Sequence, residues 1–324
     1  MSLDVLVEAQ PRRRRRRYRL RRLAPLLVVV LAALVLGATF GARRVVNPPR
    51  REVVPQSAPV KTIHAARPIS LLHGTPNLVG VLRRHVQAQA GILVDARTGQ
   101  VLWQRRPHER RPVASTTKIM TALLALKEVP WESTITVDKR ATLVPLVKEG
   151  LRKGERVRAW KLFYSLLLYS GNDDAAQLAI SAAGSIRAFL GQMNAEAARL
   201  GLHDTHFRSP SGVIDKGNYS SAWDLAALTR YALRNPTFRR IVRRKRIEVS
   251  WAPPTNAKVY VNNNWLLHEY PGADGVKTGY THASGWCLVA SAERRGRTLI
   301  AVLLDDGNMY ADARALLNLG FRNG

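Results

Sequence analysis

The sequence predicts an α+β domain: one antiparallel sheet packed by helices, carrying a mostly helical subdomain. Two observations predict this fold. Strand patterns gather at both ends of residues 77–324, whereas helical patterns fill the middle of that range. The last two strand patterns are joined by the short turn Glu293-Arg-Arg-Gly296, which is typical of an antiparallel hairpin. A third observation, an apolar run ahead of this region, predicts one N-terminal transmembrane helix.

Three segments are predicted before this domain. Residues 1–22 carry nine arginines between Arg12 and Arg22, and residues 23–42 form an uncharged run rich in Leu, Val and Ala. Such a run is long enough to span a bilayer, and the arginines predict a cytoplasmic N-terminus with everything after residue 42 exported. A cleaved signal sequence, giving a secreted protein, is the alternative, although no clean Ala-x-Ala site follows. Six prolines in residues 43–76 indicate an extended linker.

The composition narrows the partners and the chemistry. A net charge of +28 suits an anionic membrane, a cell-wall polymer or a nucleic acid. The arginines are scattered and form no nucleic-acid-binding motif, so we expect no nucleic-acid partner. Cys287 is the single cysteine, which rules out an intrachain disulfide, and we expect it to be buried. His203 and His206 have no accompanying carboxylate pattern, so we expect a structural role for both, no metal and no cofactor.

The elements of residues 77–324 follow in chain order. A hairpin comes first and a helix closes the chain. The predicted elements are strands at 91–95 and 100–103, a helix from about 115 to 126, a short strand at 135–137, helices at 160–168, 174–183, 186–200 and 222–233, a basic stretch at 238–246, strands at 275–280, 286–291 and 298–304, and a helix at 310–319.

The helix that begins near Ser115 combines an apolar body with a lysine one turn in. Its apolar residues surround nearly the whole helix, which indicates a helix inside the domain. Lys118 follows Ser115 by three residues, so the two side chains share one face. A desolvated lysine can act as the base that a serine nucleophile needs. The pattern predicts an acyl-transfer site, although a capping serine and a solvent-exposed lysine would produce the same four letters.

Two further polar motifs lie at positions where they can face the same cleft. Ser170-Gly171-Asn172 falls in a short connection between two helical patterns, and Lys277-Thr278-Gly279 enters a strand. Taken alone, the first motif would be a turn that ends one helix and caps the next.

Together the three motifs resemble those of the penicillin-binding and serine β-lactamase superfamily. Longer stretches narrow the resemblance to the D-alanyl-D-alanine carboxypeptidases, the low-molecular-weight penicillin-binding proteins of peptidase family S11. The stretches that carry it are residues 111–121, 209–213, 219–226 and 270–281, and the likeness runs from about Ala88 to Phe321. It implies the serine β-lactamase/DD-peptidase fold, described as transpeptidase-like.

The resemblance implies a role for each motif residue. Ser115 would be acylated by the penultimate D-alanine of a peptidoglycan stem pentapeptide, with Lys118 as proton acceptor and Ser170 as proton relay. Asn172 would hold the substrate amide and orient Lys118. Lys277 and Thr278 would bind the terminal carboxylate, and Gly279 would let the substrate backbone lie against the strand. The backbone N–H groups of Ser115 and Tyr280 would form the oxyanion hole, and β-lactams would act as inhibitors.

Three alternatives remain open. A DD-endopeptidase that cleaves cross-links shares all three motifs. A β-lactamase of the same fold is disfavoured because no Glu-x-x-x-Asn loop follows Ser170-Gly171-Asn172, where that class carries the glutamate that hydrolyses the acyl-enzyme. A non-catalytic cell-wall-binding protein would account for the basic charge but not for the intact Ser115, Lys118, Ser170 and Lys277.

Overall fold

The structure, a computed structural model, describes Leu71 and residues 86–322 apart from 215 and 254. The predicted cytoplasmic segment, the apolar run and nearly all of the linker lie outside the described residues. Within the described ranges, no helix is both long enough and apolar enough to cross a bilayer. Leu71, which falls in the predicted linker, is buried.

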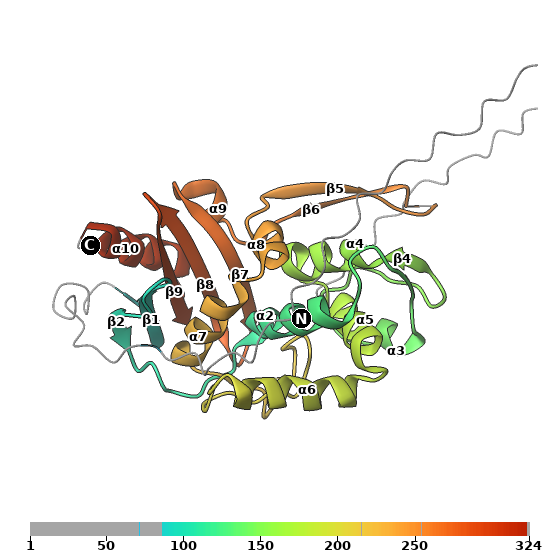
Figure 1. Cartoon of the computed structure of the whole chain (residues 1–324), viewed down its shortest axis with the longest axis horizontal. Coiled ribbons are helices and arrows are strands. Elements are labelled where there is room, and N and C mark those ends of the chain that lie inside the picture. The colour runs from blue at the N-terminus through green and yellow to red at the C-terminus, as the bar shows by residue number, and fades with distance from the viewer. Residues whose placement is uncertain (1–70, 72–85, 215, 254, 323–324) are drawn as a thin grey trace, which may run out of the picture. The chain divides into compact units, whose positions relative to one another are not determined.

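A five-stranded antiparallel sheet forms one side of the domain, with strand order β2-β1-β9-β8-β7 (Figure 1). The first two strands of the chain therefore pair beside its last three, as the strand patterns at both ends predict. The edge strand β7 pairs only with β8 among the described strands. The strands are β1 Ala90–Asp95, β2 Val101–Arg105, β7 Ala273–Thr281, β8 Gly285–Arg294 and β9 Arg297–Leu304.

Helices cover both faces of this sheet, and β9 shows how the sequence directs them. Leu299, Ala301 and Leu303 belong to the core shared with the C-terminal helix α10, Met309–Arg322. The intervening residues of β9 belong to the larger core on the other face, which includes helix α7, Ala222–Ala232. This alternation is the two-residue period of a strand buried on both faces.

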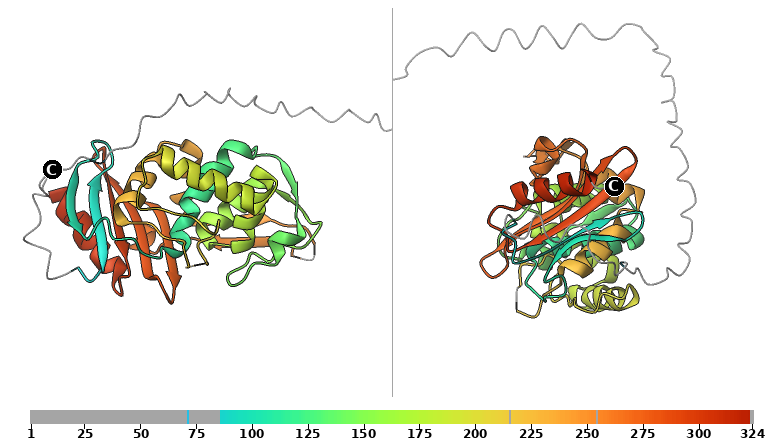
Figure 2. Two further views of the ribbon diagram at one scale, coloured as in Figure 1. Left: turned by 90° about the horizontal axis from the view of Figure 1, so that it is seen from below. Right: turned by 90° about the vertical axis from the view of Figure 1, so that its left-hand side faces the viewer.

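The helical subdomain lies beside the sheet, with α2, Lys118–Glu128, running between the two parts (Figures 1 and 2). Its buried residues surround the helix, as predicted. The other elements of this subdomain are β3 Thr134–Thr136, α3 Lys139–Thr142, β4 Arg156–Arg158, α4 Ala159–Tyr164, the π-helix η2 Ser165–Tyr169, α5 Asn172–Ala183 and α6 Ile186–Arg199.

The segment between α7 and β7 departs most from the prediction. The basic stretch at 238–246, for which no helix or strand was predicted, contributes to helix α8, Pro236–Val242, and begins strand β5, Arg246–Ser250. Asn235 begins α8 by accepting hydrogen bonds from the N–H groups of Thr237 and Phe238. Strand β6, Ala257–Val261, pairs with β5 in a separate hairpin, and the short helix α9, Leu266–Glu269, follows.

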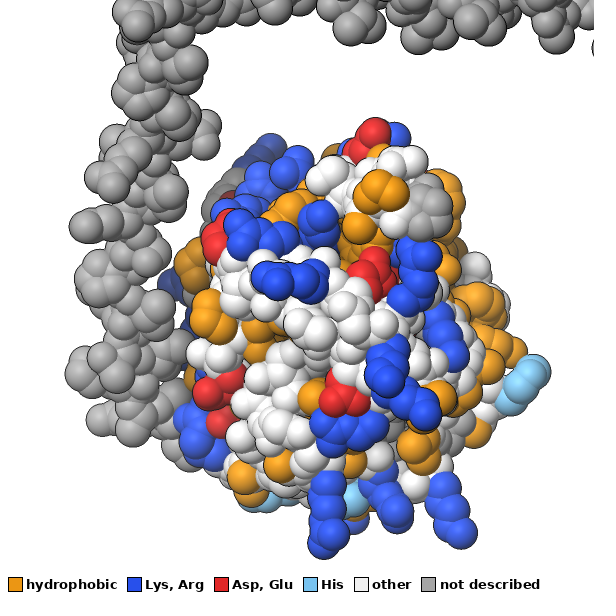
Figure 3. Space-filling view, turned by 90° about the vertical axis from the view of Figure 1, so that its right-hand side faces the viewer, with side chains coloured by type: hydrophobic (Ala, Val, Ile, Leu, Met, Phe, Trp, Pro, Cys, Tyr) orange, Lys and Arg blue, Asp and Glu red, His pale blue; other side chains and the backbone are white. Residues whose placement is uncertain are grey.

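On one face of the molecule, basic side chains are spread out rather than gathered in a single patch (Figure 3). On the face shown in Figure 3, Lys and Arg side chains alternate with acidic, apolar and uncharged polar ones. The positive charge on this face is therefore distributed, which suits attraction to an extended anionic polymer or surface.

Candidate active site

Ser115 lies in a short 3-10 helix, η1, Ala114–Thr117, which leads directly into α2. The predicted helix therefore begins three residues later than expected, at Lys118, and Ser115 makes no capping hydrogen bond. Ala114 has a φ of 45°, and residues other than glycine rarely adopt a positive φ. Strain of this kind is typical of functional sites, and here it lies next to Ser115.

Lys118 joins all three of the side chains that the first two motifs supply. Its Nζ lies 2.9 Å from Ser115 Oγ, 3.2 Å from Ser170 Oγ and 2.7 Å from Asn172 Oδ1. The lysine is fully buried, so the solvent-exposed interpretation of this residue is excluded.

Burial sets the charge state of this amine. The pKa of Lys118 lies well below its ordinary value, mainly because burial disfavours the ammonium form and also because Lys277 is near. Asp174 and Asp173 oppose this shift. A neutral amine has two N–H groups and one lone pair, which matches two acceptors and one hydroxyl donor. Ser170 and Asn172 take the two N–H groups, leaving the lone pair for the proton of Ser115.

The connection that contains the Ser-Gly-Asn motif is shorter than predicted. Ser170 has a left-handed φ of 77° and ends the π-helix η2, whereas Asn172 is already the first residue of α5. The prediction that all three motif residues lie in the connection was therefore wrong for Asn172. Its place in the first helical turn gives this side chain a rigid support.

A second layer of bonds holds Asn172 in place. Its Nδ2 donates to the carbonyl of Pro145 at 3.0 Å, which leaves Oδ1 for Lys118. Its backbone N–H donates to the carbonyl of Val147 at 2.9 Å. Asp173 ties the same loop to α5, since its carboxylate accepts the backbone N–H groups of residues 149, 150 and 151.

Beneath this motif lies a buried carboxyl cluster that the sequence analysis missed. The hydroxyl of Ser165 is 2.7 Å from Glu149 Oε2 and 2.5 Å from Asp174 Oδ2. One hydroxyl has a single proton to donate, so one carboxyl must be protonated. Burial, together with Asp173 and Glu149, raises the pKa of Asp174 well above its ordinary value. Asp174 is therefore the neutral acid, and Glu149 is paired with Lys258.

The third motif lies on the edge strand β7, opposite Ser115. Lys277 is fully buried, and burial lowers its pKa to about 7. Its Nζ donates to the carbonyl of Thr278 at 2.9 Å. A Cβ at Gly279 would lie 2.8 Å from the backbone N of Ser115, so glycine lets η1 approach the strand. The family resemblance implied a different reason for this glycine, namely contact with the substrate backbone.

A second structural device that the motifs did not reveal supports η1 from behind. Gly212 has a φ of 79°, and a Cβ there would lie 1.8 Å from the carbonyl oxygen of Ala114. Thr121 Oγ1 donates to the carbonyl of Pro210 at 2.5 Å. Asn218 Nδ2 donates to Thr117 Oγ1 at 3.2 Å. The Ser209–Val213 stretch therefore packs against the segment that carries Ser115.

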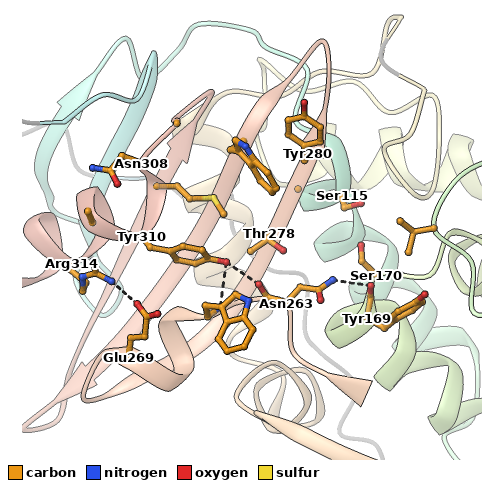
Figure 4. A pocket seen from close by; sticks show the side chains of 17 residues that line it. Ser115, Tyr169, Ser170, Asn263, Glu269, Thr278, Tyr280, Asn308, Tyr310 and Arg314 are labelled. Carbon is orange, nitrogen blue, oxygen red and sulfur yellow. Dashed lines mark hydrogen bonds and ion pairs between the residues drawn. The ribbon is translucent and has the colours of Figure 1, made fainter. Parts of the chain in front are cut away.

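Ser115, Ser170, Thr278, Gly279 and Tyr280 open into one groove with a volume of about 760 Å³ (Figure 4). From Ser115 the groove passes Thr278 and continues to the ion pair of Glu269 and Arg314. Its size is that of a site for a ligand with many atoms rather than for a single small group.

The remaining candidate residues lie outside this groove. Cys287 is buried in β8, and burial raises the pKa of its thiol to about 11. His206 Nδ1 is 2.7 Å from the carbonyl of Gly217, a bond that holds a loop. In the part of the chain that the structure describes, no group of three or more His, Cys, Asp and Glu side chains is arranged to hold a metal ion.

The fold, together with a buried lysine in contact with a serine hydroxyl, is that of the serine peptidases. The family model described as D-alanyl-D-alanine carboxypeptidase matches residues 78–308. The D-alanyl-D-alanine carboxypeptidase of Streptomyces sp. strain K15 is 34% identical, over 82% of this chain and 97% of that protein. DacB2 of Mycobacterium tuberculosis, a D-alanyl-D-alanine carboxypeptidase, is 37% identical over 72% of this chain and 82% of that protein.

A solved structure gives the same result. The Streptomyces K15 DD-transpeptidase superposes with a TM-score of 0.69 at 33% identity, covering 73% of this chain and 98% of that one. The chain belongs to the D-alanyl-D-alanine carboxypeptidase family, peptidase family S11, and has the serine DD-peptidase fold.

Proposed function

We propose that this enzyme removes the terminal D-alanine from peptidoglycan stem pentapeptides through an acyl-enzyme on Ser115. The contact of the buried Lys118 amine with the Ser115 hydroxyl at 2.9 Å carries the proposal, and burial lowers the pKa of this amine well below its ordinary value. The geometry suits general-base activation of a serine, which needs the base within hydrogen-bonding distance of the proton it takes.

Acylation begins when Ser115 Oγ attacks the carbonyl carbon of the penultimate D-alanine and its proton passes to Lys118 Nζ. The backbone N–H groups of Ser115 and Tyr280 stabilise the oxyanion that forms. As the C–N bond breaks, the proton returns through Ser170 to the leaving amine of D-alanine. Ser170 suits this relay because its hydroxyl is 3.2 Å from Lys118 Nζ. Water then hydrolyses the ester and regenerates Ser115.

Lys277 and Thr278 bind the terminal carboxylate of the substrate. Lys277 is buried on β7 beside the site, and Thr278 lines the groove next to Ser115. A carboxylate that binds there would restore the charged form of Lys277, because an opposite charge favours the ammonium. Asn172 holds the substrate amide in addition to orienting Lys118.

β-Lactams present a carbonyl and a carboxylate with a similar spacing, so they acylate Ser115 as inhibitors. The ring-opened product stays attached and blocks the approach of water. No Glu-x-x-x-Asn loop follows the Ser-Gly-Asn motif. The chain therefore lacks the glutamate with which a β-lactamase of this fold would hydrolyse the acyl-enzyme.

The N-terminal part of the proposal concerns location. Residues 1–22 stay in the cytoplasm, residues 23–42 span the membrane, and residues 43–76 link the anchor to a catalytic domain at 77–324 that lies outside. The arginine cluster and the uncharged run support this arrangement. The basic surface of the domain suits an anionic wall or membrane.

D-Alanine release tests the proposed activity. Purified full-length protein is incubated with a synthetic pentapeptide ending in D-Ala-D-Ala, and free D-alanine is measured. We expect release by the native protein and none above background from Ser115→Ala. Absence of release by a folded native protein contradicts the proposal.

A further inference from the structure

Four polar side chains form a connected chain beneath the Ser-Gly-Asn motif. Asp174 Oδ2 lies 2.5 Å from the Ser165 hydroxyl, and the same hydroxyl lies 2.7 Å from Glu149 Oε2. The other carboxylate oxygen of Glu149 contacts Lys258 Nζ, and this amine also donates to the backbone carbonyl of Glu149 at 3.1 Å. Lys258 belongs to β6, so the chain joins the β5–β6 hairpin to the helix that begins with Asn172.

This chain can hold its shared proton on either carboxyl group. With the proton on Asp174, that carboxyl donates to Ser165 Oγ, and the Ser165 hydroxyl donates to the Glu149 carboxylate. With the proton on Glu149, both hydrogen bonds reverse and the negative charge lies on Asp174. The two arrangements use the same contacts, so the charges around the chain decide between them.

Two contacts favour the arrangement with the proton on Asp174. The ammonium group of Lys258 lies against Glu149, and a buried carboxylate needs such a partner. Asp174 Oδ1 is buried and has no hydrogen-bond partner among the described residues, which costs a neutral carboxyl less than a carboxylate. The pKa of Asp174, which burial raises well above its ordinary value, agrees with this assignment.

The position of this proton matters for Lys118. Asp174 lies two residues after Asn172, whose Oδ1 is 2.7 Å from Lys118 Nζ. A negative charge on Asp174 raises the pKa of Lys118, because it favours the ammonium form. Only the neutral amine can take the proton of Ser115. A carboxylate at Asp174 therefore weakens the supply of active base at a given pH, whereas a neutral carboxyl group does not.

We propose that Lys258 is a positioning residue for this reaction: by pairing with Glu149 it keeps the negative charge of the chain on Glu149 and leaves Asp174 neutral, so that Lys118 stays an active base. The inference rests on the proposed function, because it takes Lys118 as the group that activates Ser115. Lys258 acts through the chain of hydrogen bonds and does not contact the reacting groups.

The other ionisable groups around Asp174 are the same in both arrangements. Asp173 accepts three backbone N–H groups of residues 149–151, which suits a carboxylate. Tyr260 stays neutral, because burial, together with Glu149 and Asp174, raises the pKa of its hydroxyl. In the described part of the chain, the ionisable groups that face Asp174 are Asp173 on α5, Glu149 on the loop before β4, Lys258 and Tyr260 on β6, and Lys118 on α2.

The pH dependence of acylation tests this inference on the full-length protein. The probe is an uncharged active ester of a D-alanyl peptide, so that Lys277 has no substrate carboxylate to bind. The rate constant for acylation of Ser115 is measured against pH, and the midpoint of its rise reports the loss of a proton from Lys118. We expect Lys258→Met to move this midpoint to a pH about 1 higher, because Asp174 then carries the charge.

Two variants at Asp174 separate the position of the charge from other effects. Asp174→Asn is neutral at every pH, so its midpoint should match that of the native enzyme. A midpoint that falls in this variant shows that Asp174 is charged in the native enzyme, and the inference is then wrong. In Lys258→Met combined with Asp174→Asn the midpoint should return to the native value. A midpoint that stays raised there also overturns the inference, because the lost cation would act directly.

Lys161→Met is the matched control for Lys258→Met. Both lysines lie over the ring of Trp251, with Nζ at 5.3 Å from its centroid for Lys161 and 4.0 Å for Lys258. Lys161 donates to the carbonyl of Ser250 instead of pairing with Glu149. Its loss should leave the midpoint unchanged, and an equal shift in both variants would assign the effect to packing on Trp251.

The outcomes distinguish this inference from the proposed function. If the native enzyme neither releases D-alanine nor is acylated on Ser115, the proposed function fails. If the native enzyme is active and Lys258→Met lowers the rate by the same factor at every pH, Lys258 has only a structural role and the inference is wrong. Lys258→Arg keeps the cation, so its midpoint should match that of the native enzyme.

Discussion

Gly171 and Asp174 lie so close that no side chain fits at position 171. A Cβ built on Gly171 would be 2.0 Å from Asp174 Oδ2 and 3.2 Å from Ser165 Oγ. Real Cβ contacts of this kind do not approach within 3.0 Å. The glycine of the Ser-Gly-Asn motif is therefore required by the buried, neutral carboxyl beneath it, and that carboxyl is part of the support for Ser170 and Asn172.

Gly171→Ala tests this relationship. Overpacking against a buried group costs roughly 1–3 kcal/mol, so we expect the free energy of unfolding to fall by that amount. We also expect slower acylation, since Ser170 and Asn172 shift relative to Lys118. Denaturant unfolding and the rate of D-alanine release measure the two effects.

Gly191→Ala is the matched control for that variant. Gly191 lies in the middle of α6, and a Cβ there would have no neighbour within 4 Å. Alanine in a helix is favoured over glycine by roughly 0.5–1 kcal/mol, so this variant should be slightly more stable and fully active. Equal behaviour of the two variants would contradict the steric role of Asp174.

The pKa values of the two buried lysines predict the pH profile. Lys118 accepts a proton only when neutral, so kcat/KM rises as the pH increases through its lowered pKa. Lys277 attracts a carboxylate only when protonated, and its pKa is about 7 in the free enzyme. For substrates with a free terminal carboxylate we therefore expect kcat/KM to fall above about pH 7. A substrate with an amidated terminus should lack this alkaline fall, and identical profiles would exclude Lys277 from carboxylate binding.

Lys277→Ala should act on substrate binding rather than on the nucleophile. A charge-assisted hydrogen bond contributes about 1.5–3 kcal/mol, so kcat/KM for the pentapeptide should fall about 10-fold to 100-fold. Acylation of Ser115 by an uncharged active ester should change much less. Unchanged kcat/KM for the pentapeptide would remove Lys277 from the site.

The N-terminal proposal is tested in cells. Protease added to intact spheroplasts should digest the catalytic domain, and the mature protein should still begin at Met1 or Ser2. A mature N-terminus near residue 39 or 43 would instead show a cleaved signal sequence.

The sequence predicted the parts of the fold that have strong local patterns. The β9 strand alternates between two cores, and α2 is apolar on all sides, so both were placed within a few residues. The hairpin of β5 and β6 was missed because its strands are mostly exposed and each has one fully buried residue. The π-helix η2 was missed because its residues, Ser165–Tyr169, have the same apolar pattern as the α-helix before it.

The candidate site, like the fold, has a part that the sequence predicted and a part that it did not. The grouping of Ser115, Lys118, Ser170 and Asn172 was predicted from the motifs, and the structure brings these side chains together. The long-range partners were not predictable, because Glu149, Ser165 and Lys258 lie far apart in the chain. One feature of the sequence could have indicated that Asp174 supports the motif. It lies two residues after Asn172, and Gly171 comes just before that asparagine.

The mass of the penicillin-treated enzyme tests the central claim most directly, namely that Ser115 is an acylated nucleophile with no means of rapid β-lactam hydrolysis. Full-length protein is treated with penicillin, and the intact mass and the modified peptide are determined. We predict a long-lived adduct of one penicillin on the peptide containing Ser115, absent from Ser115→Ala. Rapid recovery of unmodified enzyme after many turnovers, or an adduct on another serine, would contradict the account.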